Sequence, residues 1–292
     1  MRTVLVTGGT GFIGSNLAIA LRDRGCAVRI LRREGSNLRA LGSADVEHSI
    51  GDVRDPDALR RAVKGCDTVF HTAALVSYWP RQREEMFAVN IRGTANLVAS
   101  CLESGVSRFV HTSSIAAIGF TANGSPADET TPFNWDRYNV GYRISKRQAE
   151  EEVLKGVKLG LPAVIVNPSV VMGPRDIHFH GGQIVRDVAR KRIFYYVKGG
   201  INVVDVGDVV VGHIRAAEQG RIGERYILSG HNLTHREMIS VVHSVVGGIP
   251  PLFPLPRWFS RTLAAGAETI GNMTGTKPWI TRELIAGVHL HS

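Results

Sequence analysis

Tyr142 and Lys146 are the pair in this sequence whose types and spacing best suit acid–base chemistry. They stand four residues apart, so a helix through them would carry both side chains on one face. A free phenol has a pKa of about 10, too high for easy proton exchange at neutral pH, and a neighbouring cation favours the phenolate. Tyr142 is therefore a candidate general acid or base, with Lys146 supplying the electrostatic field. The same spacing is also common on exposed helix faces.

A glycine-rich turn follows the first strand-like run and has the spacing of a phosphate-binding loop. In such a loop the first glycine permits a tight turn, the second lets the backbone approach a pyrophosphate, and the third lets the helix pack closely on the strand. The free N–H groups and the dipole at the helix N-terminus favour the anion. A plain glycine-rich turn is the alternative. The residues expected to line a bound dinucleotide here are Gly8, Thr10, Gly11, Phe12, Ile13 and Gly14.

The end of the second strand-like run bears on the choice of dinucleotide. An acid normally holds the adenosine ribose at this position, and NADP sites replace it with arginine for the extra phosphate. Arg32 and Arg33 stand there, and a guanidinium matches a phosphate in charge and in forked hydrogen-bond geometry. The sequence therefore favours NADP. NAD is the alternative, because Glu34 is close enough to accept from the ribose, and the two arginines would also suit a solvated turn.

Strand-like and helix-like stretches alternate along the first half of the chain, which predicts an α/β fold with a doubly wound parallel sheet, the Rossmann fold. The β-branched runs are Thr3–Thr7, Ala27–Leu31, Thr68–His71, Arg108–Thr112 and Ala163–Asn167. The helix-like stretches are Ile13–Arg24, Pro56–Lys64, Glu84–Ser104 and Tyr142–Leu159. The glycines expected to end the first three of these helices are Gly25, Gly65 and Gly105.

The alternation weakens after Pro168, which indicates a smaller C-terminal substrate-binding lobe. We expect residues 1–170 to form the NAD(P)-binding domain and residues 171–202 and 229–292 to form the lobe. Residues 203–228 are expected to return to the main sheet, because Val203–Val211 resembles a strand followed by a helix start. Thr234 and Glu237 form a capping box that predicts a helix start in the lobe.

Composition limits the class of protein. The length of 292 residues fits one α/β body with a smaller lobe. The formal charge is +9, but the arginines are spread along the chain and no nucleic-acid motif occurs, so no nucleic-acid partner is expected. No apolar run is long enough to span a membrane, no apolar signal segment precedes the first strand, and three cysteines form no CxxC, which favours the cytoplasm.

Histidine pairs at positions 178 and 180, 231 and 235, and 289 and 291 raise the question of a metal site. None has the carboxylate or cysteine neighbours of a zinc site, and the expected chemistry needs no metal. We therefore expect no metal ion.

Seven features in one order make the sequence resemble the extended short-chain dehydrogenase/reductase family, which contains NAD-dependent sugar epimerases, dehydratases and dihydroflavonol reductase-like enzymes. The resemblance covers about residues 1–230. The features are Thr7–Gly14, Gly51–Val53 with His71–Ala74, Asn90 in Val89–Thr94, Thr112–Ser114, Tyr142 with Lys146, Asn167–Ser169 and Val204–Val209.

The resemblance implies a role for each matching residue. Ser114 would hydrogen-bond the reacting oxygen, with Ser113 as the competing candidate, while Lys146 would grip the cofactor ribose. Asn90 would lie behind the active site as a backbone or water anchor, unless it is an ordinary polar residue on a helix. The adenine, the cofactor cleft and the nicotinamide would be contacted by Asp52 and Val53, Ala73 and Ala74, and Pro168 and Ser169 respectively.

The expected reaction is hydride transfer between NADP(H) and a carbonyl or alcohol of a medium-sized, partly apolar molecule, with Tyr142 exchanging the proton. A sugar epimerase or dehydratase is the alternative on the same fold. Ile201 stands where nucleotide-sugar epimerases typically place a diphosphate-binding arginine, although an arginine at 175, 186 or 190 would compensate. The chain is therefore more similar to dihydroflavonol reductase-like enzymes and hopanoid-associated sugar epimerases. A non-catalytic dinucleotide sensor that binds a protein partner is the third hypothesis.

Two segments bear on assembly. The stretch Glu84–Ser104, with Phe87, Ile91 and Leu97–Val98, would pair across a two-fold axis in a homodimer. Trp258 and Phe259, after four prolines, suit lobe core or an oligomer contact better than a membrane-surface helix. Relatives usually continue past Ser292 with a segment that helps close the lobe, so the sequence leaves open whether the chain is truncated.

Overall fold

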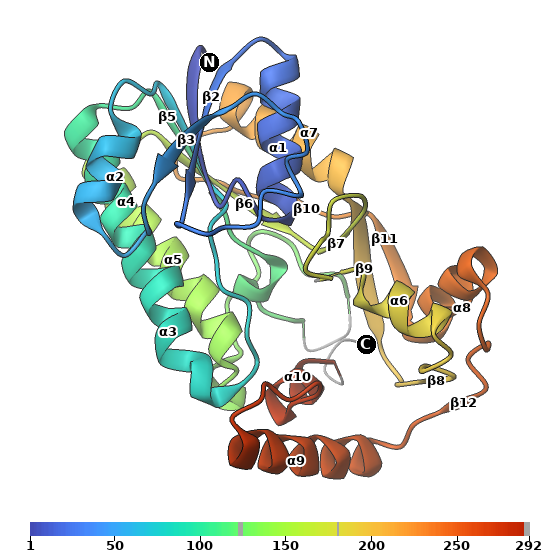
Figure 1. The fold of residues 1–292 in the computed structure, drawn as a ribbon. Helices are drawn as coiled ribbons and strands as arrows, with labels where there is room; N and C mark the ends of the chain where they lie inside the picture. The colour runs from blue at the N-terminus through green and yellow to red at the C-terminus, as the bar shows by residue number, and fades with distance from the viewer. Residues whose placement is uncertain (122–124, 180, 289–292) are drawn as a thin grey trace.

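A parallel sheet of seven strands organises the larger part of the molecule, in the order β10-β6-β5-β4-β1-β2-β3 (Figure 1). The structure is a computed structural model that describes residues 1–121, 125–179 and 181–288. All five predicted strands are present within one residue of their expected bounds, whereas β3 and β10 were not delimited from the sequence. The strands are β1 Thr3–Thr7, β2 Ala27–Arg32, β3 Glu47–Ile50, β4 Thr68–His71, β5 Arg108–Thr112, β6 Ala163–Pro168 and β10 Arg225–Leu228.

The strand order reverses between β1 and β4. From β1 the chain winds outward through β2 and β3, then returns to β4 on the other side of β1 and winds outward through β5, β6 and β10. In sheets of this kind ligands bind at the carboxyl ends of the strands, at the point of reversal. The doubly wound Rossmann fold predicted from the sequence is therefore confirmed, and it directs attention to the ends of β1, β4 and β5.

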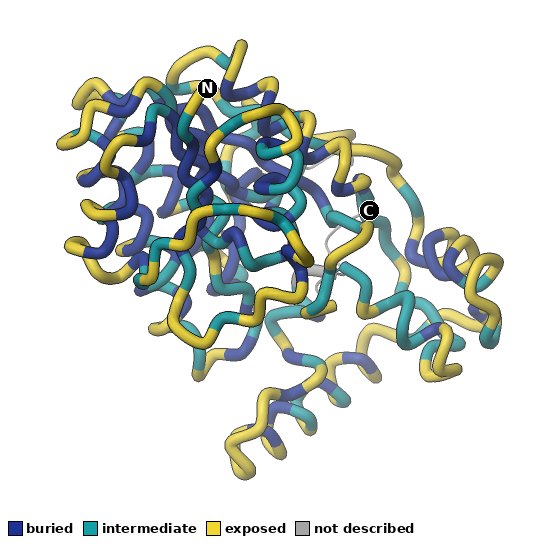
Figure 2. The backbone as a smooth tube through the Cα atoms, turned by 45° about the horizontal axis from the view of Figure 1, so that its top comes forward, coloured by how far each residue is buried: buried dark blue, intermediate teal, exposed yellow. Residues whose placement is uncertain are grey.

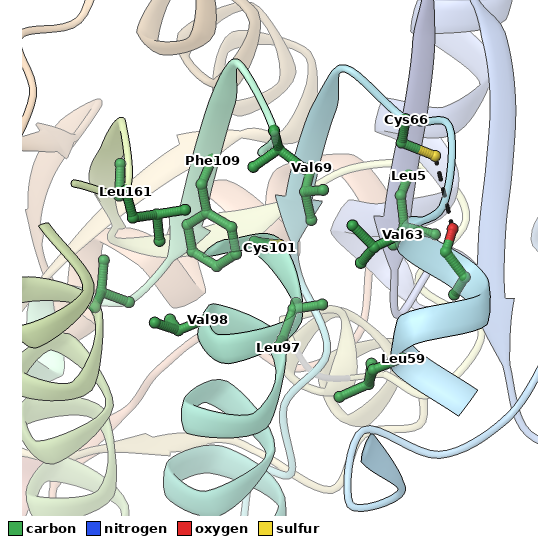
Figure 3. Packing of buried hydrophobic residues seen from close by; sticks show 14 of the residues in the cluster. Leu5, Leu59, Val63, Cys66, Val69, Leu97, Val98, Cys101, Phe109 and Leu161 are labelled. Carbon is green, nitrogen blue, oxygen red and sulfur yellow. Dashed lines mark hydrogen bonds between the residues drawn. The ribbon is translucent and has the colours of Figure 1, made fainter. Parts of the chain in front are cut away.

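Helices cover both faces of the sheet (Figure 1). One face carries α1 Phe12–Asp23 and α7 Val206–Gln219, and the other carries α2 Pro56–Val63, α4 Gly93–Ser104 and α5 Gly141–Lys158. Figure 3 shows how α2 and α4 pack their leucines and valines on the second face. Because central strands are covered on both sides, β1 reads as a continuous apolar run, and Val4, Leu5 and Val6 are all fully buried.

The predicted helix Glu84–Ser104 is present as a continuous helical segment that contains one π-helical turn. It consists of α3 Arg83–Phe87, a π-helical turn at Ala88–Arg92 and α4. Leu97 is fully buried and Val98 nearly so, and both belong to the core beneath the sheet. The expectation that these two residues face a second subunit is therefore wrong, because α4 uses them to cover its own sheet.

A second, three-stranded sheet in the order β11-β9-β7 starts the smaller part of the molecule. The strand predicted at Val203 belongs to this sheet and not to the main one, so α7 and β10 are the elements that return. The capping box of Thr234 and Glu237 is confirmed at the start of α8. The elements are β7 Val170–Met172, α6 Gln183–Ala189, β8 Tyr195–Tyr196, β9 Gly200–Asp205, β11 His231–Thr234, α8 His235–Val246 and β12 Phe253–Pro254.

The last two helices, α9 Arg257–Thr274 and α10 Arg282–Val288, lie apart from α8 at the edge of the molecule (Figure 1). The indole N–H of Trp79 donates to Asn272 Oδ1 at 3.0 Å, which ties α9 to the segment after β4. Much of α9 is exposed in Figure 2, and Trp258 is 70% exposed, so this residue is not lobe core. Among the described helices, none is both long and apolar enough to cross a membrane.

Candidate active site

The glycine turn between β1 and α1 is tightly packed against the strand ends. Gly8 has φ +68°, and a Cβ atom there would lie 2.7 Å from the backbone nitrogen of Ala73. A Cβ at Gly14 would lie 2.3 Å from the carbonyl oxygen of Gly8. Helix α1 begins after Gly11 with no side-chain cap and no acidic residue in its first turn. Its N–H groups are thus left for an anion, and the turn fits the pyrophosphate of a dinucleotide.

The other residues assigned to this turn differ in exposure. Phe12 is buried, whereas Thr10 and Ile13 are partly exposed beside the glycines. Only the latter two side chains therefore remain accessible at the start of α1.

The two arginines after β2 have different surroundings. The Nε of Arg32 donates to the ring nitrogen Nδ1 of His48 at 2.8 Å, and this side chain is half-buried. Arg33 is exposed, and its charge acts on Asp52 across the turn. Arg33 is therefore the freer of the two to meet a phosphate.

Asp52 is engaged within the chain. Arg54 donates to its carboxylate from Nε at 2.9 Å and from Nη2 at 2.8 Å, and these hydrogen bonds lower the pKa of Asp52. Val53 is buried against Gly93. A Cβ atom added at Gly93 would lie 2.6 Å from the methyl carbon Cγ2 of Val53. These contacts brace the turn, and the Asp52 carboxylate already has a cationic partner.

Tyr142 and Ser114 meet through their side chains. Tyr142 lies in the first turn of α5 and is buried, and Ser114 follows the carboxyl end of β5. The Ser114 side chain is close enough to the phenol to oppose the rise of its pKa, and Ser114 Oγ accepts from the N–H of Ala116 at 3.1 Å. The hydroxyl of Ser113 is buried and has no hydrogen-bond partner among the residues that the structure describes. Of the two candidate serines, Ser114 is the one beside the phenol.

Burial sets the protonation of this phenol. It raises the pKa of Tyr142 above the ordinary value, and the nearby Tyr78 adds to the shift, while Ser114 and Arg143 oppose it. Lys146 was expected to lower the pKa of Tyr142. It does not do so in this structure, because its ammonium donates to the carbonyl of Thr112 at 3.0 Å. The phenol is therefore protonated at neutral pH in the free protein, and a cation brought near it would be needed to ease the loss of its proton.

Lys146 belongs to a buried polar network. Burial lowers its pKa to about 8, and Glu150, one turn further along α5, opposes the shift. Glu150 is fully buried and accepts from Asn167 Nδ2 at 2.7 Å, and the same amide donates to the carbonyl of Ser114 at 2.9 Å. The Asn167 amide thus joins Glu150 to the backbone of Ser114, while the Glu150 charge acts on the Lys146 ammonium. Glu150 stands four residues after Lys146, and this spacing is the sequence signal that would have identified it.

Asn90 acts as a backbone clamp. From the π-helical turn its amide donates to the carbonyl of Leu75 at 3.0 Å and to Ser145 Oγ at 3.0 Å, and its oxygen accepts from the N–H of Leu75 at 2.8 Å. The segment that begins with Ala73 and Ala74 is thereby held against α5, where Ala73 is half-buried and Ala74 is exposed.

Pro168 ends β6 and Ser169 follows it, and both residues are buried. The Ser169 hydroxyl has no hydrogen-bond partner in the described part of the chain. A buried, unpartnered hydroxyl is costly unless a ligand completes it. Together with the bare N-terminus of α1, it fits a dinucleotide laid across the strand ends.

Aromatic side chains contact Tyr142 and its neighbour Arg143, and no motif predicted them. The ring of Tyr78 packs edge-on against that of Tyr142, with centroids 5.5 Å apart. Trp135 is fully buried, donates to the carbonyl of Ile118 at 2.9 Å and lies 3.6 Å below the guanidinium of Arg143. Tyr78, Met86 and Ala116 make the surroundings of the phenol largely apolar, and Arg143 adds one buried cation.

Metal ligands are not grouped anywhere in the described ranges, where no three histidine, cysteine or acidic side chains come together. His180, His289 and His291, which formed part of the histidine pairs, lie outside the described residues.

Known proteins share this architecture. The chain matches the NAD dependent epimerase/dehydratase family over residues 4–229. A putative dihydroflavonol 4-reductase from Synechocystis sp. is 36% identical over 278 residues, which cover 94% of this chain and 81% of that protein. Sterol demethylase protein B from Methylococcus capsulatus is 35% identical over 255 residues, covering 87% of this chain and 77% of that protein.

A solved structure extends the likeness to the whole fold. The UDP-glucose 4-epimerase of Thermus thermophilus, in complex with NAD, has a TM-score of 0.74 at 27% identity and covers 99% of this chain and 98% of that one. The Rossmann sheet, the glycine turn and the family match over most of the chain agree. This protein is an enzyme of the NAD dependent epimerase/dehydratase family, within the extended short-chain dehydrogenases/reductases.

Proposed function

We propose that the protein is an NADP(H)-dependent reductase that converts a carbonyl of a partly apolar molecule into an alcohol. The observation that carries the proposal is the placement of Ser114, after the carboxyl end of β5, beside the buried and protonated phenol of Tyr142 at the start of α5. A protonated phenol is the form that a carbonyl reduction requires, because the oxygen gains a proton as the carbon gains a hydride.

Each residue of the site has a separate role in the proposed reduction. The bound nicotinamide would supply the hydride. Ser114 donates a hydrogen bond to the substrate oxygen, and Tyr142 delivers the proton to that oxygen. Lys146 holds the nicotinamide ribose once its ammonium leaves the carbonyl of Thr112, and the glycine turn holds the pyrophosphate.

An apolar substrate is supported by the side chains around the phenol. Tyr78 packs on the phenol within a cluster of apolar side chains that includes Met86 and Ala116. A nucleotide sugar instead needs cationic contacts for its diphosphate, and Ile201 lies on β9 where an arginine was sought. Two relatives carry names that refer to a dihydroflavonol and a sterol, both compact ring systems. We extend that class of substrate to this chain.

NADP is the cofactor form that we propose, and exposed Arg33 beside the turn supports it. The residues after β6, with the small sheet and the helices from α8 onward, would form the substrate lobe. A cytoplasmic location and a homodimer belong to the same proposal, with the dimer resting on Phe87 and Ile91, which are half-buried.

A sugar epimerase or dehydratase with tightly held NAD is the second candidate, favoured by the likeness to the NAD-bound epimerase. Such an enzyme oxidises and then reduces its substrate without exchanging the cofactor, whereas a reductase releases NADP⁺ at each turnover. The fluorescence of the purified protein separates the two. Exchangeable NADPH that is consumed with a panel of cyclic and aromatic ketones supports the reductase, and co-purifying NAD with no NADPH consumption overturns it.

A further inference from the structure

The helix that carries Tyr142 and Lys146 has no capping side chain of its own. Helix α5 starts at Gly141, its N-cap residue Val140 contributes no side-chain hydrogen bond, and its first turn contains no acid. An uncapped start leaves backbone N–H groups without partners and a positive dipole end without a counter-charge. In this chain that end lies next to the proposed proton donor.

A carboxylate from the other end of the chain supplies the missing contact. Glu283 of α10 accepts from the N–H of Gly141 through Oε2 at 2.9 Å, across 142 positions of sequence. α10 lies with α9 at the edge of the molecule, below the sheet domain in Figure 1. The last described helix therefore contacts the catalytic helix one residue before Tyr142.

Arg83 of α3 fixes the same corner. Its Nη1 lies 3.8 Å from Glu283 Oε1 and donates to the carbonyl of Asn139 at 3.2 Å, while Nη2 donates to Asn139 Oδ1 at 2.7 Å. Asn139 has φ 49°, a left-handed conformation that asparagine tolerates better than most residues. Arg83 thus joins the turn before α5 to the carboxylate that caps it.

We infer that Glu283 is a positioning residue, through which the C-terminal part of the chain caps the acid–base helix and sets the electrostatic potential at the Tyr142 phenol. The inference rests on the proposed role of Tyr142 as proton donor. It adds a link between α10 and the reaction that no motif around Tyr142 contains.

The charged groups around Glu283 and Tyr142 determine how Glu283 affects the phenol. Glu283 faces Arg83 and Glu268, and its charge also acts on Tyr78, while Tyr142 faces Tyr78, Ser114 and Arg143. Burial raises the pKa of Glu283, and Gly141 and Arg83 oppose that shift. An ionised Glu283 offsets the positive end of α5, so its removal exposes the phenol to an uncompensated positive potential. That potential favours the phenolate and lowers the pKa of Tyr142.

The test compares Glu283→Gln, Glu283→Ala and, as a matched control, Glu151→Gln on the outer face of the same helix. Protein labelled with ¹³C at the tyrosine ring carbon Cζ is titrated by NMR with saturating NADP⁺, and the Tyr142 signal is identified by its loss in Tyr142→Phe. In Glu283→Gln the midpoint falls by about 0.5–1 pH unit relative to the wild type, and in Glu151→Gln it does not move.

Hydrogen exchange of the Gly141 amide tests whether Glu283 caps the start of α5. In Glu283→Ala the amide of Gly141 exchanges at least about 10-fold faster, whereas Glu283→Gln, which keeps an accepting oxygen, stays closer to the wild type. Because the glutamine variant conserves shape, it carries the test if the alanine variant does not fold.

A Tyr142 midpoint in Glu283→Gln that equals the wild-type value overturns the inference, as does a Gly141 amide in Glu283→Ala that exchanges at the wild-type rate. Neither outcome touches the proposed function, which fails instead if Tyr142→Phe retains full turnover.

Discussion

Gly14 lies directly against Gly8, so that a Cβ atom at position 14 would stand 2.3 Å from the carbonyl oxygen of Gly8 and 2.6 Å from Thr72 Oγ1. Both contacts are shorter than real Cβ atoms make, and the first is to rigid backbone. The glycine turn holds its shape because α1 can approach it this closely.

Gly14→Ala is therefore expected to displace the start of α1 and to weaken NADPH binding by at least about 10-fold, with a lower melting temperature. The quenching of protein fluorescence by NADPH and a thermal melt measure both. Gly266→Ala, on α9 where nothing lies within 4 Å of the added carbon, is the matched control and leaves binding unchanged. Wild-type affinity in Gly14→Ala would show that the turn does not hold the cofactor.

Arg33→Ala tests the choice of NADP. Loss of a charge-assisted contact to the 2′-phosphate costs about 1.5–3 kcal/mol, which weakens NADPH by about 10-fold or more and leaves NADH nearly unaffected. Dissociation constants for both nucleotides give the comparison. Arg39→Ala, another exposed arginine of the same connection, serves as the control. Equal weakening of the two nucleotides by Arg33→Ala would remove the phosphate contact from the proposal.

Three buried histidines under the active site make folding sensitive to acid. Burial lowers the pKa of His71 to about 3 and that of His213 to about 4, and it lowers that of His111 well below its ordinary value. The unfolded chain takes up protons below about pH 6.5 and the folded chain does not, so the free energy of unfolding falls as the pH drops from about 6.5 towards 4. Each histidine contributes a slope of about 1.4 kcal/mol per pH unit.

His111→Phe isolates one of these contributions. The ring nitrogens of His111 have no hydrogen-bond partner among the described residues, so the variant is expected to be at least as stable at pH 7 and to lose about one proton from the acid slope. Urea unfolding at pH 7, 6 and 5 gives the slope, and His231→Phe at an exposed position is the control. An unchanged slope would mean that His111 is not buried as a neutral group.

The features predicted from the sequence are those encoded by residues that stand close together along the chain. The glycine spacing at the end of β1 predicts the turn, and the apolar runs predict β1 and β4 through β6, because a strand covered on both faces has a continuous hydrophobic signature. The i+4 relation of Tyr142 and Lys146 predicts their common helix. β3 was not predicted, since Glu47–Ile50 is short, polar and largely exposed.

Contacts between distant segments were not predictable. Tyr78 reaches Tyr142 and Trp135 reaches Arg143 from loops with no periodic pattern, and Glu283 reaches Gly141 across 142 positions. Leu97 and Val98 looked suitable for a dimer face because an apolar stripe has the same appearance whether it covers its own sheet or a partner. The pKa of Tyr142 also depends on three-dimensional burial, which a spacing rule does not report.

Turnover of Tyr142→Phe tests the central claim most directly. The variant removes the phenol hydroxyl and keeps the ring against Tyr78, so the rate of NADPH consumption with a ketone that the wild type reduces is expected to fall by about 10²–10⁴-fold, with the NADPH dissociation constant within about 3-fold of the wild type. Tyr138→Phe, four residues earlier, keeps its activity. Wild-type turnover in Tyr142→Phe would contradict the assignment of this phenol as the proton donor.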